Sequence, residues 1–365
     1  MGTVLSYVVA FALGVVASVV AAIVLKRWDE SRRSRRIRDA GKDALSYDPT
    51  IDGWFRVVGW SAHRMLTRGR LNVIMSPRSD RPRQRWIPED EWNRHCEHFG
   101  AGSAVGPCGY ITDCSGVDWR EGAATQNFSV TVSPCDYSEG LATWAALRDN
   151  EEAQKRVVEA LREDPLEFIR SAPPQPLGVS IGVLSHDGRR FLALRRSATV
   201  ATARNIWTMG PYETMALPDE SAGSRPEDFF NITERGLLEE LGLNTDDYSH
   251  RVCVSWFGYF AADAHPWVFA QVRVSIADEL VLEKRKNCHS TDEASEARWM
   301  PFDRDTIEAI IRGQRVRRPM APPGPNGELA PPQPFVIVRS SVAEGRWIAH
   351  APHAANELWR MQGAL

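Results

Sequence analysis

The first 25 residues contain the feature that most limits what this chain can fold into. Val4 to Leu25 is a run of 22 residues without a charge, rich in valine, alanine and leucine. At a rise of about 1.5 Å per residue, a helix of this length crosses a hydrocarbon core of roughly 30 Å. We therefore expect a transmembrane anchor within residues 1–25, which attaches the chain to a lipid bilayer through residues 4–25.

Basic residues directly after this run predict its orientation. Seven of them follow closely, namely Lys26, Arg27, Arg32, Arg33, Arg35, Arg36 and Arg38. Trp28 lies where an interfacial aromatic residue is common, and positive charge favours the cytoplasmic side. We expect a single-pass protein of the cell membrane with Arg32–Leu365 in the cytoplasm. A cleaved signal peptide would need a basic segment before a shorter apolar core, and the seven cations disfavour a buried globular helix.

The rest of the chain has the composition of an ordinary globular protein. Its 365 residues are 43% apolar and 25% charged, with a net charge of −3. This balance excludes a mostly disordered chain and one that crosses a membrane many times. It also argues against nucleic acid as a partner, because phosphate binding needs a basic excess. The six cysteines are expected to be reduced thiols, and the cluster His95-Cys96-Glu97-His98 lacks a recognised zinc-ligand spacing.

The length predicts about two domains, and proline, glycine and charge divide the chain. We expect the anchor at 1–25, a basic juxtamembrane segment at 26–46, a small α+β region at 47–172, a second folded block at 177–313, and a Pro-rich linker with a C-terminal tail at 314–365. Pro173, Pro174 and Pro176 mark the boundary between the two blocks. No family resemblance identifies residues 47–150, for which binding of a protein partner is one role that we consider.

Apolar periodicity predicts the main elements and an α+β fold class. In the first block, apolar runs lie at 54–60, 71–75 and 128–132, the last alternating as a half-buried strand does, and a helix is expected over 151–170. In the second block, Asp187-Gly188 indicates a hairpin that joins 177–184 to 191–194. Further strands are expected at 252–260 and 267–276, helices at 224–241 and 304–312, and in the tail a strand at 335–338 and a short helix at 354–361.

Two adjacent glutamates on the helix expected over 224–241 point to chemistry. Glu239 and Glu240 lie about one turn beyond Arg235 and Gly236, and carboxylate sites suit Mg²⁺ or Mn²⁺. Such ions bind pyrophosphate oxygens, polarise phosphorus and orient an attacking water. Plain alternatives exist for each residue. A solvated helix face is the alternative for the two glutamates, although the flanking pattern disfavours it. An i,i+4 pair with Glu239 is the alternative for Arg235, and a capping box that begins at Ser224 is the alternative for Glu227.

This stretch resembles the box of the Nudix family, whose pattern is G-x5-E-x7-R-E-U-x-E-E-x-G-U, with U a bulky aliphatic residue. Glu227 matches the first glutamate and Arg235 the arginine, at the family's own spacing. The paired glutamates, the aliphatic positions and the final glycine are matched by Glu239, Glu240, Leu237, Leu243 and Gly242. Two positions depart from the pattern, because Ser221 stands at the first glycine and Gly236 replaces the glutamate after the arginine.

Flanking segments extend the resemblance over residues 177–313. Phe191–Arg196 is similar to the strand before the box, and Asn205–Gly210 to the segment that leads into it. Glu293–Pro301 is similar to the family's late segment, where an acidic residue often completes the metal site. The resemblance implies a Nudix-type α/β/α sandwich, a Mg²⁺ or Mn²⁺ cofactor and a nucleotide-like small molecule as the ligand.

The resemblance also implies roles for individual residues. The catalytic residues would be Glu239, Glu240 and Arg235. The metal ligands would be drawn from Glu239, Glu240, Glu227, Glu293 and Glu296. The ligand-binding residues would be Arg195, Trp207, Gly210 and Tyr212.

Gly236 leaves two hypotheses about function open. A glycine there removes one carboxylate and costs the helix roughly 1 kcal/mol relative to alanine. The first hypothesis is a membrane-anchored cytoplasmic Nudix-type hydrolase that cleaves a nucleoside-diphosphate-linked substrate with Mg²⁺-activated water. The second is a catalytically degenerate Nudix-fold module that binds a nucleotide-like ligand at the membrane. Gly236→Glu is expected to raise hydrolysis from near zero only under the second hypothesis.

Overall fold

The computed structural model describes residues 54–59, 66–77, 86–100, 107–118, 123–198, 205–217, 226–248, 252–261, 264–288, 293–311, 314–317, 334–338 and 345–348. Within these ranges, no helix combines the length and apolarity needed to cross a bilayer. The expected transmembrane segment 4–25 and the basic segment 26–46 lie outside the described residues, and so does the short helix expected at 354–361. These three expectations therefore stay predictions.

The described residues form a mixed α+β fold in which 14 strands join in one sheet. The order is β12-β13-β14-β7-β6-β5-β10-β9-β1-β4-β2, and β11 pairs with β6, β3 with β4, and β8 with β5. The strands are β1 (Trp54–Gly59), β2 (Leu71–Met75), β3 (Cys108–Asp118), β4 (Ala123–Cys135), β5 (Gly178–Leu184), β6 (Arg190–Arg196), β7 (Trp207–Thr208), β8 (Tyr212–Thr214), β9 (Cys253–Phe260), β10 (His265–Arg273), β11 (Ala294–Pro301), β12 (Gln314–Arg317), β13 (Pro334–Val338) and β14 (Gly345–Ile348).

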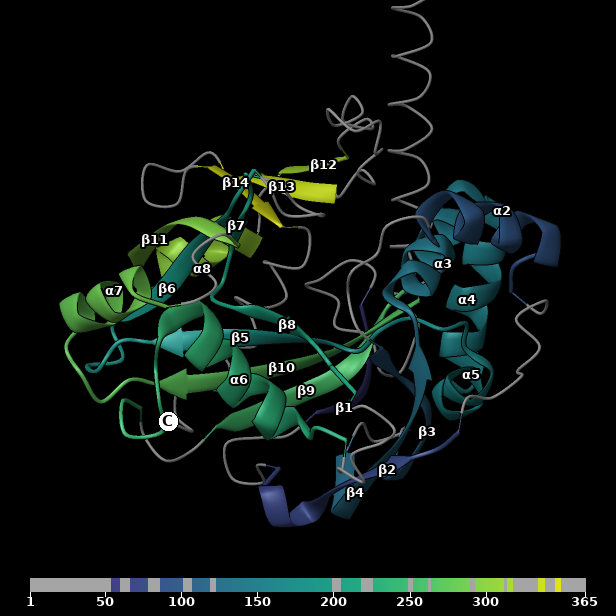
Figure 1. Ribbon diagram of the computed structural model, residues 1–365, viewed down its shortest axis with the longest axis horizontal. Coiled ribbons are helices and arrows are strands. Elements are labelled where there is room, and N and C mark those ends of the chain that lie inside the picture. Colours follow the sequence, from purple (N-terminus) through teal and green to yellow (C-terminus); the bar gives the residue numbers. More distant parts are fainter. Residues whose placement is uncertain are drawn as a thin grey trace, which may run out of the picture.

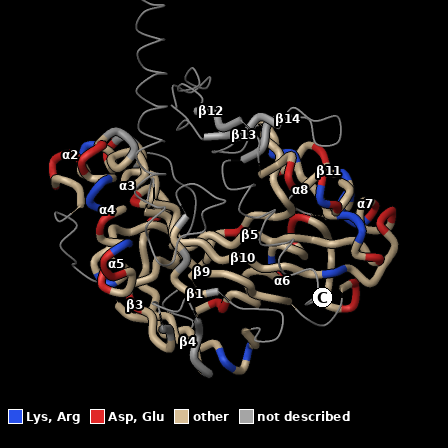
Figure 2. The backbone as a smooth tube through the Cα atoms, turned by 180° about the vertical axis from the view of Figure 1, so that it is seen from behind, with Lys and Arg blue, Asp and Glu red and all other residues tan. Residues whose placement is uncertain are grey.

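The helices gather in three places around this sheet (Figure 1). α2 (Glu89–Gly100), α3 (Tyr137–Asp149), α4 (Glu151–Glu163) and α5 (Pro165–Ser171) lie together at one end. α7 (Asp278–Lys286) and α8 (Arg304–Ile311) lie at the other end, and α6 (Phe229–Leu241) crosses the middle strands. A short 3-10 helix, η1 (Arg68–Arg70), precedes β2. Figure 2 shows that charged residues concentrate on the peripheral helices, whereas the central strands are mostly uncharged.

The centre of the sheet is the parallel pair β5 and β10, in register from Gly178 opposite Trp267 to Leu184 opposite Arg273. Every residue of β5 is buried, as is typical of a strand covered on both faces. The expected hairpin between β5 and β6 is confirmed, because Gly188 has φ +69° and Leu184 lies opposite Phe191. The strands expected at 252–260 and 267–276 are confirmed as β9 and β10, with shifted ends.

The first block continues the same sheet rather than forming a separate one. β1 pairs antiparallel with β9, from Trp54 opposite Phe260 to Gly59 opposite Trp256. The ring of Phe168 in α5 also packs edge-on against Tyr259 of β9, with the ring centroids 5.2 Å apart. The boundary expected at 172–177 falls between α5 and β5, and the division into domains stays a prediction.

Several expectations about the helices are wrong in detail. The helix expected over 151–170 is broken into α4 and α5, because Pro165 cannot continue the backbone hydrogen bonds and Asp164 caps the new helix by accepting from Leu166 N and Glu167 N. α2, α3 and α7 were not anticipated. In the tail, β13 confirms the strand expected at 335–338, and β12 and β14 pair with it on either side.

Candidate functional site

The box helix α6 begins at Phe229, five residues after the expected start at Ser224. Asp228 is its N-cap, and its carboxylate accepts a hydrogen bond of 2.7 Å from Asn231 N. Gly242 ends the helix in the left-handed conformation, with φ +67°. Glu227 therefore precedes the cap, so its interpretation as part of a capping box is wrong. Its carboxylate is free to turn towards the side of the helix that carries Arg235.

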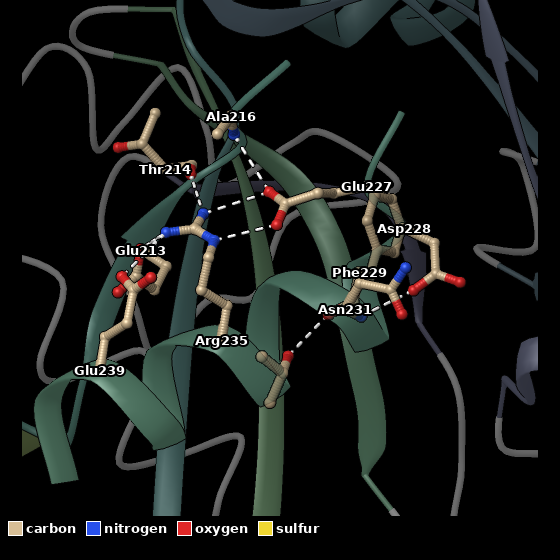
Figure 3. A network of polar contacts seen from close by, with 10 residues as sticks. Glu213, Thr214, Ala216, Glu227, Asp228, Phe229, Asn231, Arg235 and Glu239 are labelled. Atoms are coloured by element: carbon tan, nitrogen blue, oxygen red, sulfur yellow. Dashed lines mark hydrogen bonds and ion pairs between the residues drawn. The ribbon is translucent and has the colours of Figure 1, made fainter. Parts of the chain in front are cut away.

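Arg235 is the centre of a polar network that ties α6 to β8 and to Glu227 (Figure 3). Its guanidinium donates to both carboxylate oxygens of Glu227, at 2.9 and 3.2 Å. It also donates to Glu213 Oε2 at 2.7 Å and to the carbonyl oxygen of Thr214 at 2.8 Å. The i,i+4 contact with Glu239 is the longest, at 3.5 Å. Glu227 and Arg235 thus form a bidentate ion pair. A simple surface ion pair with Glu239 does not account for the contacts of Arg235.

Glu239 and Glu240 have different surroundings, because neighbouring residues on a helix point about 100° apart. The side chain of Glu239 is 47% exposed. Glu240 is 5% exposed, and its Oε1 accepts a hydrogen bond of 3.1 Å from Tyr212 N. Burial, together with the charges of Glu213 and Glu293, raises the pKa of Glu240 to about 8. A carboxyl group in this position gains strongly from a nearby cation.

Glu213, on β8, was missed from the sequence because it lies outside the box. Its side chain is 11% exposed and forms the shortest ion pair of Arg235. Burial raises the pKa of Glu213 to about 7 against the opposing charge of Arg235, and the charges of Glu293 and Glu239 add to the rise. The available sequence signal was weak, consisting of one acidic residue shortly after Gly210-Pro211.

The structure separates the two late glutamates that were expected as metal ligands. Glu293 precedes β11 and acts electrostatically on both Glu213 and Glu240. Glu296, on β11, instead forms an ion pair of 3.6 Å with Arg195, and both side chains are nearly half exposed. Glu293 therefore belongs with the carboxylates around α6, whereas Glu296 and the expected ligand-binding residue Arg195 hold each other on the sheet.

The other expected ligand-binding residues also have structural contacts. Trp207 is buried, with the guanidinium of Arg298 4.0 Å from its ring centroid. Gly210 has φ +85°, and a Cβ there would overlap the carbonyl oxygen of Ile181. Tyr212 packs against Trp267 at a centroid distance of 4.5 Å. A role for Trp207, Gly210 and Tyr212 in ligand binding stays a prediction, while their role in shaping the segment around β8 is visible.

The donor chemistry of this site fits a hard divalent cation such as Mg²⁺ or Mn²⁺. The side chains that converge on the inner side of α6 offer carboxylate oxygens, and one of them, Glu240, is buried. Within the described residues, however, no group of three or more histidine, cysteine, aspartate or glutamate side chains is already arranged to hold a metal ion. Glu213, Glu227 and Glu239 face Arg235 instead. Ion binding would therefore require some of these carboxylates to change partners.

Comparison with known proteins gives only structural neighbours. No protein-family model matches the sequence, and no curated protein matches it. A MutT protein from Methanosarcina mazei Go1 is 18% identical over 37% of this chain and 80% of its own, with a TM-score of 0.23. An Ap4A hydrolase from C. elegans is 13% identical over 36% of this chain and 84% of its own, with a TM-score of 0.23.

A third similar structure is a bifunctional NMN adenylyltransferase/ADP ribose pyrophosphatase from Francisella tularensis, complexed with AMP and a manganese ion. It is 14% identical over 45% of this chain and 46% of its own, with a TM-score of 0.25. Nudix and MutT hydrolases are thus among the solved structures that resemble part of this chain.

Proposed function

We propose that this chain is a Nudix-type hydrolase that cleaves a nucleoside diphosphate linked to another group. The observation that carries the proposal is the ion pair between Glu227 and Arg235, formed at the spacing of the box, with the buried Glu240 on the same helix. A solvated helix face would leave both glutamates of the pair exposed. Here only Glu239 is exposed, and Glu240 faces the sheet.

Each residue of the site has its own role in the proposed function. Arg235 orients Glu227 and Glu213 through charge-assisted hydrogen bonds. The backbone N–H of Tyr212 fixes Glu240, and Glu239 remains accessible to a ligand from the solvent side. Glu239, Glu240, Glu227 and Glu293, with Glu213, are the residues that would hold a divalent cation. When bound, such an ion neutralises diphosphate oxygens and makes phosphorus more susceptible to attack by water.

Attachment to the membrane is part of the same proposal. It is supported by the uncharged run Val4–Leu25 and the cations that follow it. A reporter fused after Leu365 should be active only on the cytoplasmic side, and the full-length chain should sediment with membranes. A reporter that is active only outside, or a full-length chain in the soluble fraction, would contradict this part.

The test of the activity is phosphate or nucleotide release from nucleoside-diphosphate-linked compounds by the full chain with Mg²⁺. Glu239→Gln and Glu240→Gln should each lower the rate by about 100-fold or more, since each removes a carboxylate from the site. Glu279→Gln is the matched control, because Glu279 is an exposed acidic residue on α7. Glu239→Gln and Glu279→Gln should unfold at nearly the native temperature, and Glu240→Gln should remain folded.

The competing function has its own signature in this experiment. If a nucleotide raises the unfolding temperature of the native chain but no compound is hydrolysed, the chain is a binding module. If Glu239→Gln and Glu240→Gln hydrolyse the substrate at the native rate, the assignment of the site is wrong.

A further inference from the structure

The space beside Gly236 is already filled by another carboxylate side chain. A Cβ at position 236 would lie 2.5 Å from Cγ of Glu213 and 2.8 Å from Cδ1 of Ile181. Real Cβ atoms do not approach heavy atoms this closely, because van der Waals repulsion rises steeply. Glu213 thus occupies the place where a side chain on α6 would begin, and Gly236 is the residue that admits it.

Glu213 reaches this place from a different element. It lies on β8, opposite Val179 of β5, and enters the site from the sheet rather than from the helix. A carboxylate attached at position 236 would stand three and four residues before Glu239 and Glu240, on the same side of the helix. Glu213 interacts electrostatically with both of these residues and with Glu293. It therefore meets the same neighbours that a box glutamate would meet.

A purely structural role, as the counterion of Arg235, does not account for this arrangement. Arg235 already forms a bidentate ion pair with Glu227, so Glu213 is a second counterion for the same guanidinium. Glu239 is a third contact of that group, and Glu240 lies buried nearby. The acidic side chains outnumber the cations that act on them, which are Arg235 and, for Glu240, Arg196. A divalent cation bound among these carboxylates would offset their mutual repulsion.

We propose that Glu213 supplies, from β8, the metal-binding carboxylate that Gly236 has removed from α6. This inference rests on the proposed function, since it assigns a ligand to the same divalent-cation site. It also explains why the box can carry a glycine without losing an acidic group. Under this proposal Gly236→Glu alone restores nothing, because the new side chain collides with Glu213.

The experiment measures binding of Mn²⁺ alone to the full chain, by calorimetry and by the electron paramagnetic resonance signal of the free ion. Glu213→Gln, which keeps the size of the side chain, should weaken Mn²⁺ binding by about 10-fold or more. Gly236→Glu should lower the unfolding temperature and bind Mn²⁺ no more tightly than the native chain. The double variant Glu213→Gly with Gly236→Glu returns the carboxylate to the helix and should recover binding to within a few fold of native.

If Glu213→Gln binds Mn²⁺ as tightly as the native chain does, Glu213 is only a counterion of Arg235 and the inference is wrong. A native chain that binds no Mn²⁺ overturns the inference as well. If the double variant fails to fold, the comparison of Glu213→Gln with the exposed control Glu279→Gln still decides it. Weakened Mn²⁺ binding in Glu213→Gln without hydrolysis of any diphosphate would leave the ligand assignment standing and remove the proposed activity.

Discussion

The two sides of α6 are held by ion pairs of different character. On the outer side, Arg68 of η1 donates to Glu234 at 2.7 Å and to Asn231 at 2.5 Å, and the Arg68 and Glu234 side chains are 49% and 33% exposed. On the inner side, Arg235 is 25% exposed and its partner Glu213 only 11%. Water screens the outer pair strongly and the inner network weakly. The same type of contact should therefore matter little on one side and much on the other.

The two blocks of the chain contribute differently to the site. The first block contacts α6 through Arg68, which binds Glu234, and through Phe128, whose ring centroid lies 6.3 Å from that of Phe229. The backbone of the first block also pairs with the residues that follow β8, since Gly109 N donates to Met215 O and Leu217 N donates to Pro107 O. The second block supplies the charged groups of the inner side. The described part of the first block thus supports the box helix and β8 from outside, and the second block carries the candidate site.

The largest effect is expected for Arg235→Ala. This change leaves Glu213 and Glu227 without their shared cation in a largely buried place, so the free energy of unfolding should fall by about 2–3 kcal/mol. Arg235→Lys should recover only part of the loss, because lysine cannot hold Glu227 with two parallel hydrogen bonds. Urea unfolding monitored by circular dichroism measures both. A loss below about 0.5 kcal/mol for the alanine variant would mean that the inner network is no stronger than a surface pair.

The free energy of unfolding should depend on pH because Glu240 is buried, and replacing the exposed Glu239 should leave this dependence in place. In metal-free protein the folded state keeps the proton of Glu240 up to a pKa of about 8, whereas the unfolded chain releases it near the ordinary value of 4.5. Stability is then full below about pH 4.5 and falls as the pH rises towards 8, because the unfolded state binds fewer protons there. At about 1.4 kcal/mol for each pKa unit, the fall is on the order of a few kcal/mol at most.

Urea unfolding at several pH values, with a chelator present, tests this prediction. Glu240→Gln should remove most of the slope and leave a part that ends near pH 7, the pKa of Glu213. Glu239→Gln is the comparison, and it should keep the native slope. Equal slopes in the native chain and in Glu240→Gln would show that burial does not control this carboxyl group.

The smallest effect is expected for Arg68→Ala on the outer side. Both side chains of its ion pair are substantially exposed, so the loss should be about 0.5 kcal/mol and should shrink further in 0.5 M salt. Arg156→Ala is a useful contrast from the same block, because the guanidinium of Arg156 donates to the backbone carbonyl of Trp86 instead of to an acid, and its loss should depend less on salt. A loss above 2 kcal/mol for Arg68→Ala would place the outer contact on a par with the inner one.

The sequence predicted what depends on local spacing. The box helix and the β5–β6 hairpin each involve residues close together in the chain, so helical or turn geometry alone specifies them. The contact between Glu227 and Arg235 was not predicted, because Glu227 lies before the N-cap Asp228 and outside the helix. Glu213 could not be predicted in this way. It reaches Gly236 only because β8 pairs with β5 while α6 packs over both strands. No apolar periodicity in the sequence indicates this contact, because the contact depends on tertiary packing.

The first block shows a different kind of failure. α3 was missed although Asp136 and Glu139 have the spacing of a capping box, and the structure contains that box. Within 151–170 the apolar spacing continues through Pro165, so periodicity predicted one helix where proline and Asp164 produce two. In both places the local signals at helix ends were more informative than the pattern of apolar residues between them.

Because β1 pairs with β9, the half of the protein that carries the candidate site depends on the other half for solubility as well as for shape. Gly258 lies so close to the carbonyl oxygen of Phe55 that a larger residue would force the two strands apart. Without β1, the row of backbone groups along β9, flanked by Trp256, Phe257 and Tyr259, would become an open edge. Open apolar edges recruit strands from other molecules. A proteolytic product or shortened transcript that begins near Gly178 should therefore self-associate instead of persisting as a monomer.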